Sequence, residues 1–235
     1  GYRYYSSRQL YSFYMIRSLR EMGLSLAEIK AYLDARSPQG FLALLKEQEK
    51  WLQQEIHKYQ RMKKLVRNQS RLLAMAAGLD CESVVEQELP AAQFIITQNV
   101  RGLREVEKER VVLEHMRYCM DRELNAGYAF GAMIAPVDCW TAQEDCVSFY
   151  FTQTDAKTWA AEAERRHLRP AGRYAVTYLR GDYMNTSAAY QRLKDYFSRH
   201  GWQPVGYAYE ESVLEDMSAP SPEEYITRII LRIQK

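Results

Sequence analysis

The sequence predicts an α+β protein in which helices fill the N-terminal third and a helix-backed antiparallel sheet fills the rest. Two observations favour this division. Residues 41–77 contain neither Gly nor Pro, which indicates a single long helix. After residue 80, short apolar stretches alternate with Gly and Pro turn signals and with two main helical segments, a pattern typical of an antiparallel sheet with helices on it.

Two short helices are expected before the long one. Ser6 or Ser7 caps the first helix, which runs to about Met22. Residues Ser25–Glu28 form a capping box and begin the second helix. The run Ser37–Gly40 breaks the chain before the long helix starts.

The long helix carries an apolar stripe that repeats every seven residues. Its members are Leu45, Leu52, Tyr59, Val66 and Leu73. A helix of this length measures about 55 Å at 1.5 Å per residue, which is longer than a small core covers. A coiled coil between two copies of the chain would bury the stripe, and packing against its own domain is the alternative.

The C-terminal part is expected to contain six strand segments and three helices. The strand segments are 88–96, 128–134, 146–152, 173–180, 207–214 and 226–233, and the helices are 105–125, 155–167 and 188–200. We therefore divide the chain at residues 38 and 79, into a short helical region (1–38), a dimerisation helix (39–79) and a sheet domain (80–235).

Composition and charge narrow the class of protein. No stretch is long and apolar enough for a membrane span, and the four cysteines form no CxxC pair, so a cytoplasmic protein without a metal site or other cofactor is expected. Residues 1–80 carry 14 Lys and Arg against 7 Asp and Glu, whereas residues 81–235 carry 18 against 23. The basic front suits an anionic partner such as nucleic acid, and a solvated helical surface is the alternative.

The N-terminal residues resemble the MerR family of transcription regulators. The resemblance rests on Gly1–Ser6, Leu10 and Leu19–Lys30, followed by the long helix in the place of the family's dimerisation coil. It implies that Tyr2, Arg3 and Tyr4 contact DNA phosphates. Because the family's helix-turn-helix precedes this motif, the resemblance also implies that the helix-turn-helix is absent from this chain.

The C-terminal part resembles the GyrI-like effector-binding domain. The residues that carry this resemblance are Glu88–Pro90, Pro170–Tyr174, Gly181–Tyr183, Ala189, Tyr190, Tyr209, Glu210 and Glu223–Thr227. Together the two resemblances imply a multidrug-binding regulator of the BmrR type.

The expected ligand pocket combines one carboxylate with aromatic rings. The resemblance aligns Glu210 with the family's buried glutamate, but strand alternation leaves open whether Glu210 or Glu211 faces inward. The expected lining residues are Tyr128, Phe130, Trp140, Tyr150, Tyr174, Tyr178, Tyr207 and Tyr225. Rings and a carboxylate suit a hydrophobic cation, whereas a surface carboxylate beside packed tyrosines is the plainer alternative.

The resemblances imply a homodimeric regulator, most simply an activator, that binds promoter DNA, distorts it and acts with RNA polymerase. No enzymatic activity is expected. Two other functions stay open: a GyrI-like hydrolase of small electrophiles that uses Glu210, and a protein that titrates a protein partner.

Overall fold

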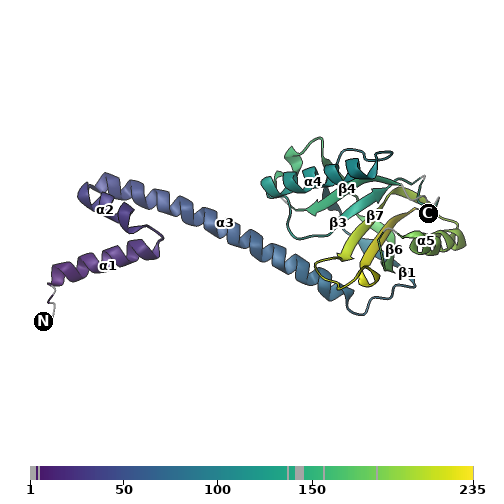
Figure 1. Cartoon of the computed structure of the whole chain (residues 1–235), viewed down its shortest axis with the longest axis horizontal. Coiled ribbons are helices and arrows are strands. Elements are labelled where there is room, and N and C mark those ends of the chain that lie inside the picture. The colour runs from purple at the N-terminus through teal and green to yellow at the C-terminus, as the bar shows by residue number, and fades with distance from the viewer. Residues whose placement is uncertain are drawn as a thin grey trace. The chain divides into compact units, whose positions relative to one another are not determined.

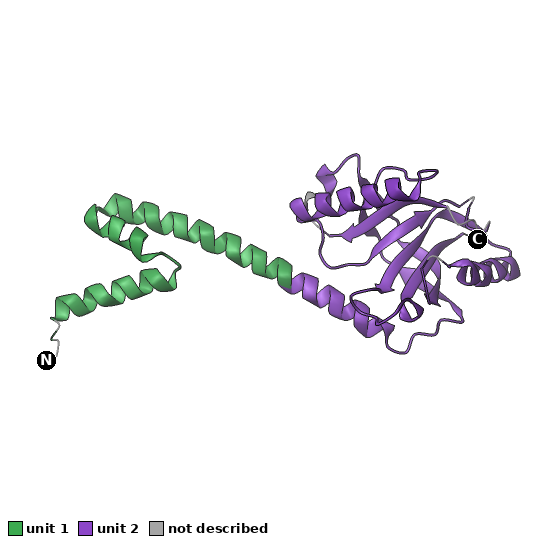
Figure 2. Cartoon of the chain, viewed as in Figure 1, with its two compact units in different colours: residues 1–62 green, residues 63–235 purple. Residues whose placement is uncertain are grey.

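The computed structural model describes residues 4, 6–136, 138–140, 146–155, 157–183 and 185–234 of the chain. The chain divides into two compact units, residues 1–62 and residues 63–235 (Figure 2). The boundary falls inside the long helix, so each unit holds one part of it.

Three helices open the chain: α1 (Ser7–Glu21), α2 (Leu26–Asp34) and α3 (Pro38–Ala76) (Figure 1). The two expected caps are confirmed. The side chains of Ser6 and Ser25 each accept a hydrogen bond from the backbone N–H three residues later and so form capping boxes. These bonds satisfy amide groups that the first turn of a helix leaves without partners.

The long helix begins earlier than expected. Pro38 is its first residue, and the Ser37 side chain accepts a hydrogen bond from the Gly40 N–H at 3.0 Å. The first position of a helix tolerates Pro because its missing N–H would have no partner there. The supposed break at Ser37–Gly40 is therefore the start of α3.

The apolar stripe of α3 is uncovered. Tyr59 and Val66 expose 61% and 62% of their surfaces, and Leu52 and Leu73 are also exposed. Only Asn68 and Ala76 are buried among the residues of this helix. Within one chain, neither unit therefore covers the stripe.

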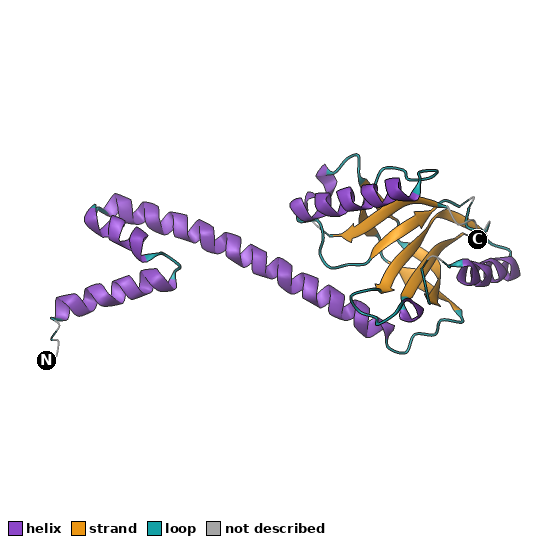
Figure 3. Ribbon diagram, viewed as in Figure 1, coloured by secondary structure: helices purple, strands orange, loops and turns teal. Residues whose placement is uncertain are grey.

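The second unit is built on one eight-stranded antiparallel sheet (Figure 3). Its strand order is β1-β6-β8-β7-β3-β4-β2-β5. The strands are β1 (Val84–Leu89), β2 (Ala92–Ile96), β3 (Phe130–Ile134), β4 (Val147–Thr154), β5 (Arg166–Arg169), β6 (Gly172–Arg180), β7 (Gln203–Leu214) and β8 (Ile226–Gln234). The helices are α4 (Glu105–Asp121) and α5 (Ser187–His200), with two short 3-10 helices, η1 (Lys157–Ala161) and η2 (Pro222–Glu224).

The prediction of a helix at residues 155–167 is wrong. Residues 155–167 form η1 and the beginning of β5 instead of a helix. Strand β5 exists because it pairs with β2, with Ala92 opposite Arg169. Such pairing between distant segments overrides the local preference of Ala, Glu and Arg for helix.

Strand register shows that both long helices of this unit cover the same face of the sheet. Residues directly opposite each other on antiparallel strands point to the same face. Ala132 lies opposite Glu210, which lies opposite Ile229. Ile95 lies opposite Thr152, which lies opposite Phe130, two residues from Ala132, so Ile95 and Ile229 point to the same face. Ile95 packs beside α4, and Ile229 packs beside α5. We call this side of the sheet the helical face.

The opposite side carries a buried group of rings, and we call it the aromatic face. The aromatic cluster consists of Phe94, Phe151, Tyr174 and Tyr209, each at most 3% exposed. The centroids of Phe94 and Phe151 are 4.3 Å apart, and those of Phe94 and Tyr209 are 5.5 Å apart. The core of this unit is therefore double, with an aliphatic half under the helices and an aromatic half on the other side.

The last turns of α3 are anchored to the sheet domain. The Asn68 side chain donates a hydrogen bond to the Ala126 carbonyl at 2.8 Å, and Lys64 forms an ion pair with Asp155. Ala76 reaches the buried group around the aromatic cluster. The end of the long helix is thus continuous with the aromatic half of the core.

No helix among the described residues has the length and apolar character needed to cross a lipid bilayer.

Candidate functional site

The aromatic face holds a buried carboxylate between two arginines. Glu211 lies on β7 and is 5% exposed. Its Oε1 is 3.3 Å from Nη1 of Arg169, and its Oε2 is 3.2 Å from Nη1 of Arg228. Arg228 also donates to Oε1 of Gln87 at 2.9 Å. The pairing meets the requirement that a buried charge have a partner of opposite sign.

Arg169 is also surrounded by rings. The centre of its guanidinium lies 5.8 Å from the centroid of Phe94, 5.5 Å from that of Tyr174 and 5.9 Å from that of Tyr209. These are the separations at which a cation is attracted to an aromatic face.

Hydrogen bonds fix the two tyrosines of the cluster. The Tyr174 hydroxyl donates to the Pro170 carbonyl at 2.6 Å, and the Tyr209 hydroxyl lies 3.0 Å from Nε2 of His167. Burial lowers the pKa of His167 and raises that of Tyr209. Both side chains are therefore neutral near pH 7, and the charge of this face comes from Glu211 and the arginines.

Glu210 points the other way. Its partners across the strands, Ala132 and Ile229, lie on the helical face. Burial raises the pKa of Glu210 to about 7, against a smaller opposing effect of Tyr190 on α5. Strand alternation had left the choice between Glu210 and Glu211 open. The structure places Glu211 on the aromatic face and Glu210 on the helical face, which also carries Phe130 and Tyr150.

The expected pocket aromatics divide between the two faces. Tyr174 and Tyr178 belong to the aromatic half of the core, and Tyr207 packs against it. Phe130 and Tyr150 stack on each other on the helical face, with centroids 5.9 Å apart.

The other three expected residues lie elsewhere. Trp140 packs against Phe197 of α5. The Tyr128 hydroxyl donates to Oδ2 of Asp155 at 2.9 Å, and Tyr225 stacks on Tyr183. The eight residues therefore do not form one pocket in this structure.

Sequence reasoning missed Phe94, Phe151, Tyr209 and Arg169. Tyr209 precedes Glu210 by one residue and shares its face with Glu211, so a decision between the two glutamates would have identified it. Arg169 was beyond reach because the short edge strand β5 was expected to be a helix.

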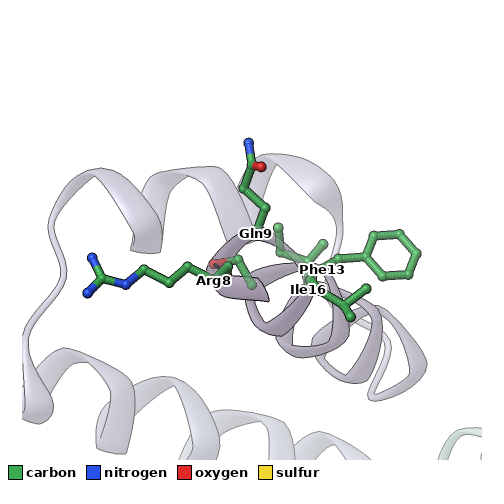
Figure 4. Close-up of a pocket in the computed structure, with 6 residues that line it drawn as sticks. Arg8, Gln9, Phe13 and Ile16 are labelled. Carbon is green, nitrogen blue, oxygen red and sulfur yellow. Dashed lines mark hydrogen bonds between the residues drawn. The ribbon is translucent and has the colours of Figure 1, made fainter. Parts of the chain in front are cut away.

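The N-terminal unit presents apolar and basic side chains on α1. A pocket of about 590 Å³ is lined by Arg8, Gln9, Leu10, Ser12, Phe13 and Ile16. Arg8 and Phe13 extend in opposite directions from the helix (Figure 4). Of the three expected DNA contacts, Tyr4 is 91% exposed, and Tyr2 and Arg3 lie outside the described residues.

Comparison with known families defines the class of the protein. The family described as "MerR, DNA binding" matches residues 14–68, which span most of α1, all of α2 and the larger part of α3. The chain is thus related to the MerR-type DNA-binding transcription regulators through this region.

Particular relatives agree with this class. The multidrug-efflux transporter 2 regulator of Bacillus subtilis (strain 168) is 28% identical over 235 residues, which are 100% of this chain and 84% of that protein. The structure of EcmrR in its DNA complex, within EcmrR-RPo, is 18% identical with a TM-score of 0.52 and covers 100% of this chain and 87% of EcmrR. The EcmrR C-terminal domain has a TM-score of 0.52 at 14% identity and covers 65% of this chain and 98% of that domain. The two EcmrR structures show the shared fold.

The family match corrects one expectation. We expected the DNA-binding helix-turn-helix to be absent, so that only a remnant of the DNA-binding region remained. This is wrong, because a MerR DNA-binding region is present at residues 14–68. We had assigned only residues 1–38 to the remainder of this region, whereas the match begins within α1 and continues into the long helix.

Proposed function

We propose that this protein is a ligand-responsive transcription activator that binds hydrophobic cations beside Glu210 in its sheet domain. It works as a homodimer on promoter DNA, which it distorts so that RNA polymerase can use the promoter. Bending a DNA site costs on the order of 1–6 kcal/mol, and the free energy of ligand binding can offset this cost.

One observation carries the ligand class. Glu210 is a buried carboxyl group that forms no ion pair with the described residues, and the stacked rings of Phe130 and Tyr150 lie on the same face of the sheet. Each ring attracts a cation by about 0.5–2 kcal/mol, and the carboxylate supplies the opposite charge. Such a site selects ligands by charge and apolar surface more than by exact shape, which suits a broad range of compounds.

The anchored end of α3 supports coupling between ligand and DNA. Ala76 packs into the buried group that contains the rings, and Asn68 holds the same helix to the sheet domain. A rearrangement of the sheet domain on ligand binding therefore acts directly on α3, the helix that continues into the DNA-binding region. The ligand changes activity only by the difference between its affinities for the two states.

The other partners follow from the relatives and from the uncovered stripe. EcmrR has been solved with DNA in EcmrR-RPo, and the relative from Bacillus subtilis is a regulator of a multidrug-efflux transporter. The exposed apolar residues of α3 are suited to a second copy of the same helix. We place the protein in the cytoplasm, because it is related to proteins that act on DNA.

Calorimetric titration with rhodamine 6G, a flat lipophilic cation, tests this proposal. We expect the full chain to bind the dye, and Glu210→Gln to weaken binding at least tenfold, or about 1.4 kcal/mol. Glu211→Gln is the matched control, because it changes a neighbouring carboxyl group on the opposite face. Thermal unfolding of each variant checks that it is folded.

Three results would contradict the proposal. Equal binding by both variants would remove Glu210 from the site. Weakening by Glu211→Gln alone would move the counter-charge to Glu211. Slow consumption of bound compounds would support the hydrolase instead.

A further inference from the structure

The two strands that carry Phe130 and Tyr150 are both connected to α3. Strand β3 begins at Phe130, and Tyr128 lies two residues before it. Strand β4 pairs with β3, and Asp155 is the first residue after it. The Tyr128 hydroxyl donates to Oδ2 of Asp155 at 2.9 Å, and the same oxygen forms the ion pair with Lys64 on α3. One carboxylate oxygen thus joins the ends of both strands to the helix.

The turn before β3 contacts the same part of the helix. The Asn68 side chain donates to the Ala126 carbonyl at 2.8 Å, and the Gln69 side chain donates to the Gly127 carbonyl at 3.3 Å. A Cβ built on Gly127 would lie 2.6 Å from the Leu65 carbonyl oxygen, so the backbones of turn and helix are in contact. A displacement of this turn is therefore transmitted directly to α3.

Strand β3 lies between Glu210 and Tyr150. On the helical face, Ala132 of β3 lies opposite Glu210 on one side and opposite Tyr150 on the other. Phe130, two residues before Ala132, points to the same face and stacks on Tyr150. Both rings keep part of their surface exposed, although β3 and β4 are inner strands of the sheet. A ligand beside Glu210 therefore lies against the strand that leads to α3.

The strand–helix joint, which residues 125–128 and Asp155 form with residues 64–69 of α3, is one of two attachments of this helix to the sheet domain. The other is Ala76, which is 7% exposed and belongs to the buried group on the aromatic face. The helix axis rises about 18 Å between Lys64 and Ala76, at 1.5 Å per residue. The side chains of Lys64 and Asp155 are 43% and 38% exposed, and exposed ion pairs contribute only about 0–1 kcal/mol. The helix is therefore able to turn about its buried end when the joint moves.

We propose that the strand–helix joint carries the ligand signal: a cation that binds beside Glu210 displaces β3, and Asp155 and Tyr128 pass this displacement to α3. This inference rests on the proposed function and names the residues that connect ligand binding to the helix. Asp155 and Tyr128 act as positioning residues. Because movement of α3 takes up part of the binding free energy, a chain with a broken joint binds the ligand more tightly.

Calorimetric titration with rhodamine 6G gives the first test. Asp155→Ala removes the shared carboxylate and should bind the dye at least fivefold more tightly than the unchanged chain. Loss of a negative charge alone would weaken binding of a cation, so charge does not explain this direction. Tyr128→Phe should tighten binding by a smaller factor, and it serves if the Ala variant fails to fold. Asp121→Ala, which removes an exposed carboxylate from α4, is the matched control and should bind as the unchanged chain does.

Hydrogen exchange gives the second test. Saturating dye should change amide exchange in residues 63–69 and 125–130 of the unchanged chain and leave the β1–β6 pair unaffected. In Asp155→Ala, the dye should still change exchange in residues 125–130 but no longer in residues 63–69. A purely structural role for Asp155 would lower stability without separating these two responses.

Three results would overturn the role of the joint and leave dye binding by the protein standing. The first is dye binding by the unchanged chain without a change in residues 63–69. The second is a response of residues 63–69 that Asp155→Ala retains at unaltered affinity. The third is weaker dye binding by Asp155→Ala, which would make this carboxylate part of the ligand site. Absence of dye binding by the unchanged chain and by Asp155→Ala would overturn both the joint and the proposed function.

Discussion

At the scale of residues, two adjacent glutamates have opposite environments. Glu211 is paired with Arg169 and Arg228, whereas none of the described residues forms an ion pair with Glu210. Burial without a cationic partner favours the neutral acid, and this is why the pKa of Glu210 rises to about 7. One strand thus carries a charged carboxylate on the aromatic face and a carboxyl group that titrates near neutral pH on the helical face.

This difference predicts how stability depends on pH. Because the pKa of Glu210 is higher in the folded chain than its ordinary value of 4.5, its contribution is fully present below about pH 4.5 and is lost as pH rises through about 7. The unchanged chain should lose about 2 kcal/mol of unfolding free energy over this interval, and Glu210→Gln should not. Urea unfolding between pH 5 and 8 measures the difference. Glu109→Gln, an exposed position on α4, is the control, and a pH profile of Glu210→Gln parallel to that of the unchanged chain would refute the prediction.

At the scale of elements, the end of α3 meets the sheet domain at a glycine. Gly127 has φ +76°, and a Cβ built on it would lie 2.6 Å from the Leu65 carbonyl oxygen on α3. The turn that precedes β3 therefore lies so close to the α3 backbone that only glycine, which has no Cβ, fits at position 127. Gly78, just after α3, has φ +81° but open space around it.

Alanine substitutions at the two glycines distinguish backbone strain from a steric clash with α3. Gly78→Ala should lower the free energy of unfolding by about 1 kcal/mol, because alanine is strained in the left-handed conformation. Gly127→Ala should cost about 1–3 kcal/mol more, because the methyl group pushes the helix away from the turn. Chemical unfolding of both variants gives the comparison. Equal losses would mean that α3 moves aside without cost and that this contact does not hold the helix.

At the scale of the whole molecule, the exposed stripe of α3 supports the proposed homodimer. Four of its five predicted residues are exposed in the single chain. Burial of apolar surface contributes about 25 cal/mol for each Å², so a helix pair is the simplest way to stabilise so long a stripe.

A charge placed in this stripe should separate the dimer. We expect Val66→Glu to shift the chain to monomer, because Val66 is 62% exposed and lies in the middle of the repeat. Gln60→Glu introduces the same side chain at an exposed polar position and should leave the dimer intact. Sedimentation velocity measures both, and the prediction fails if the two variants have the same sedimentation coefficient.

Local patterns were sufficient for most of the elements. The caps at Ser6 and Ser25, the long helix and the central strands each have a signal within a few residues, and the structure confirms them. Strand β5 has no such signal, since its four residues become a strand only by pairing with β2. The missed edge strand removed Arg169 from the predicted site.

The sequence by itself determined that two helices precede a long helix with an apolar stripe, and that two neighbouring glutamates face opposite sides of a strand. It did so because helix caps, heptad spacing and strand alternation are properties of consecutive residues. Only the tertiary structure decided that Glu211 is the residue among the rings and that Arg169 lies beside it. Alternation places neighbours on opposite faces but does not say which face the helices cover, and that depends on contacts between segments far apart in the chain.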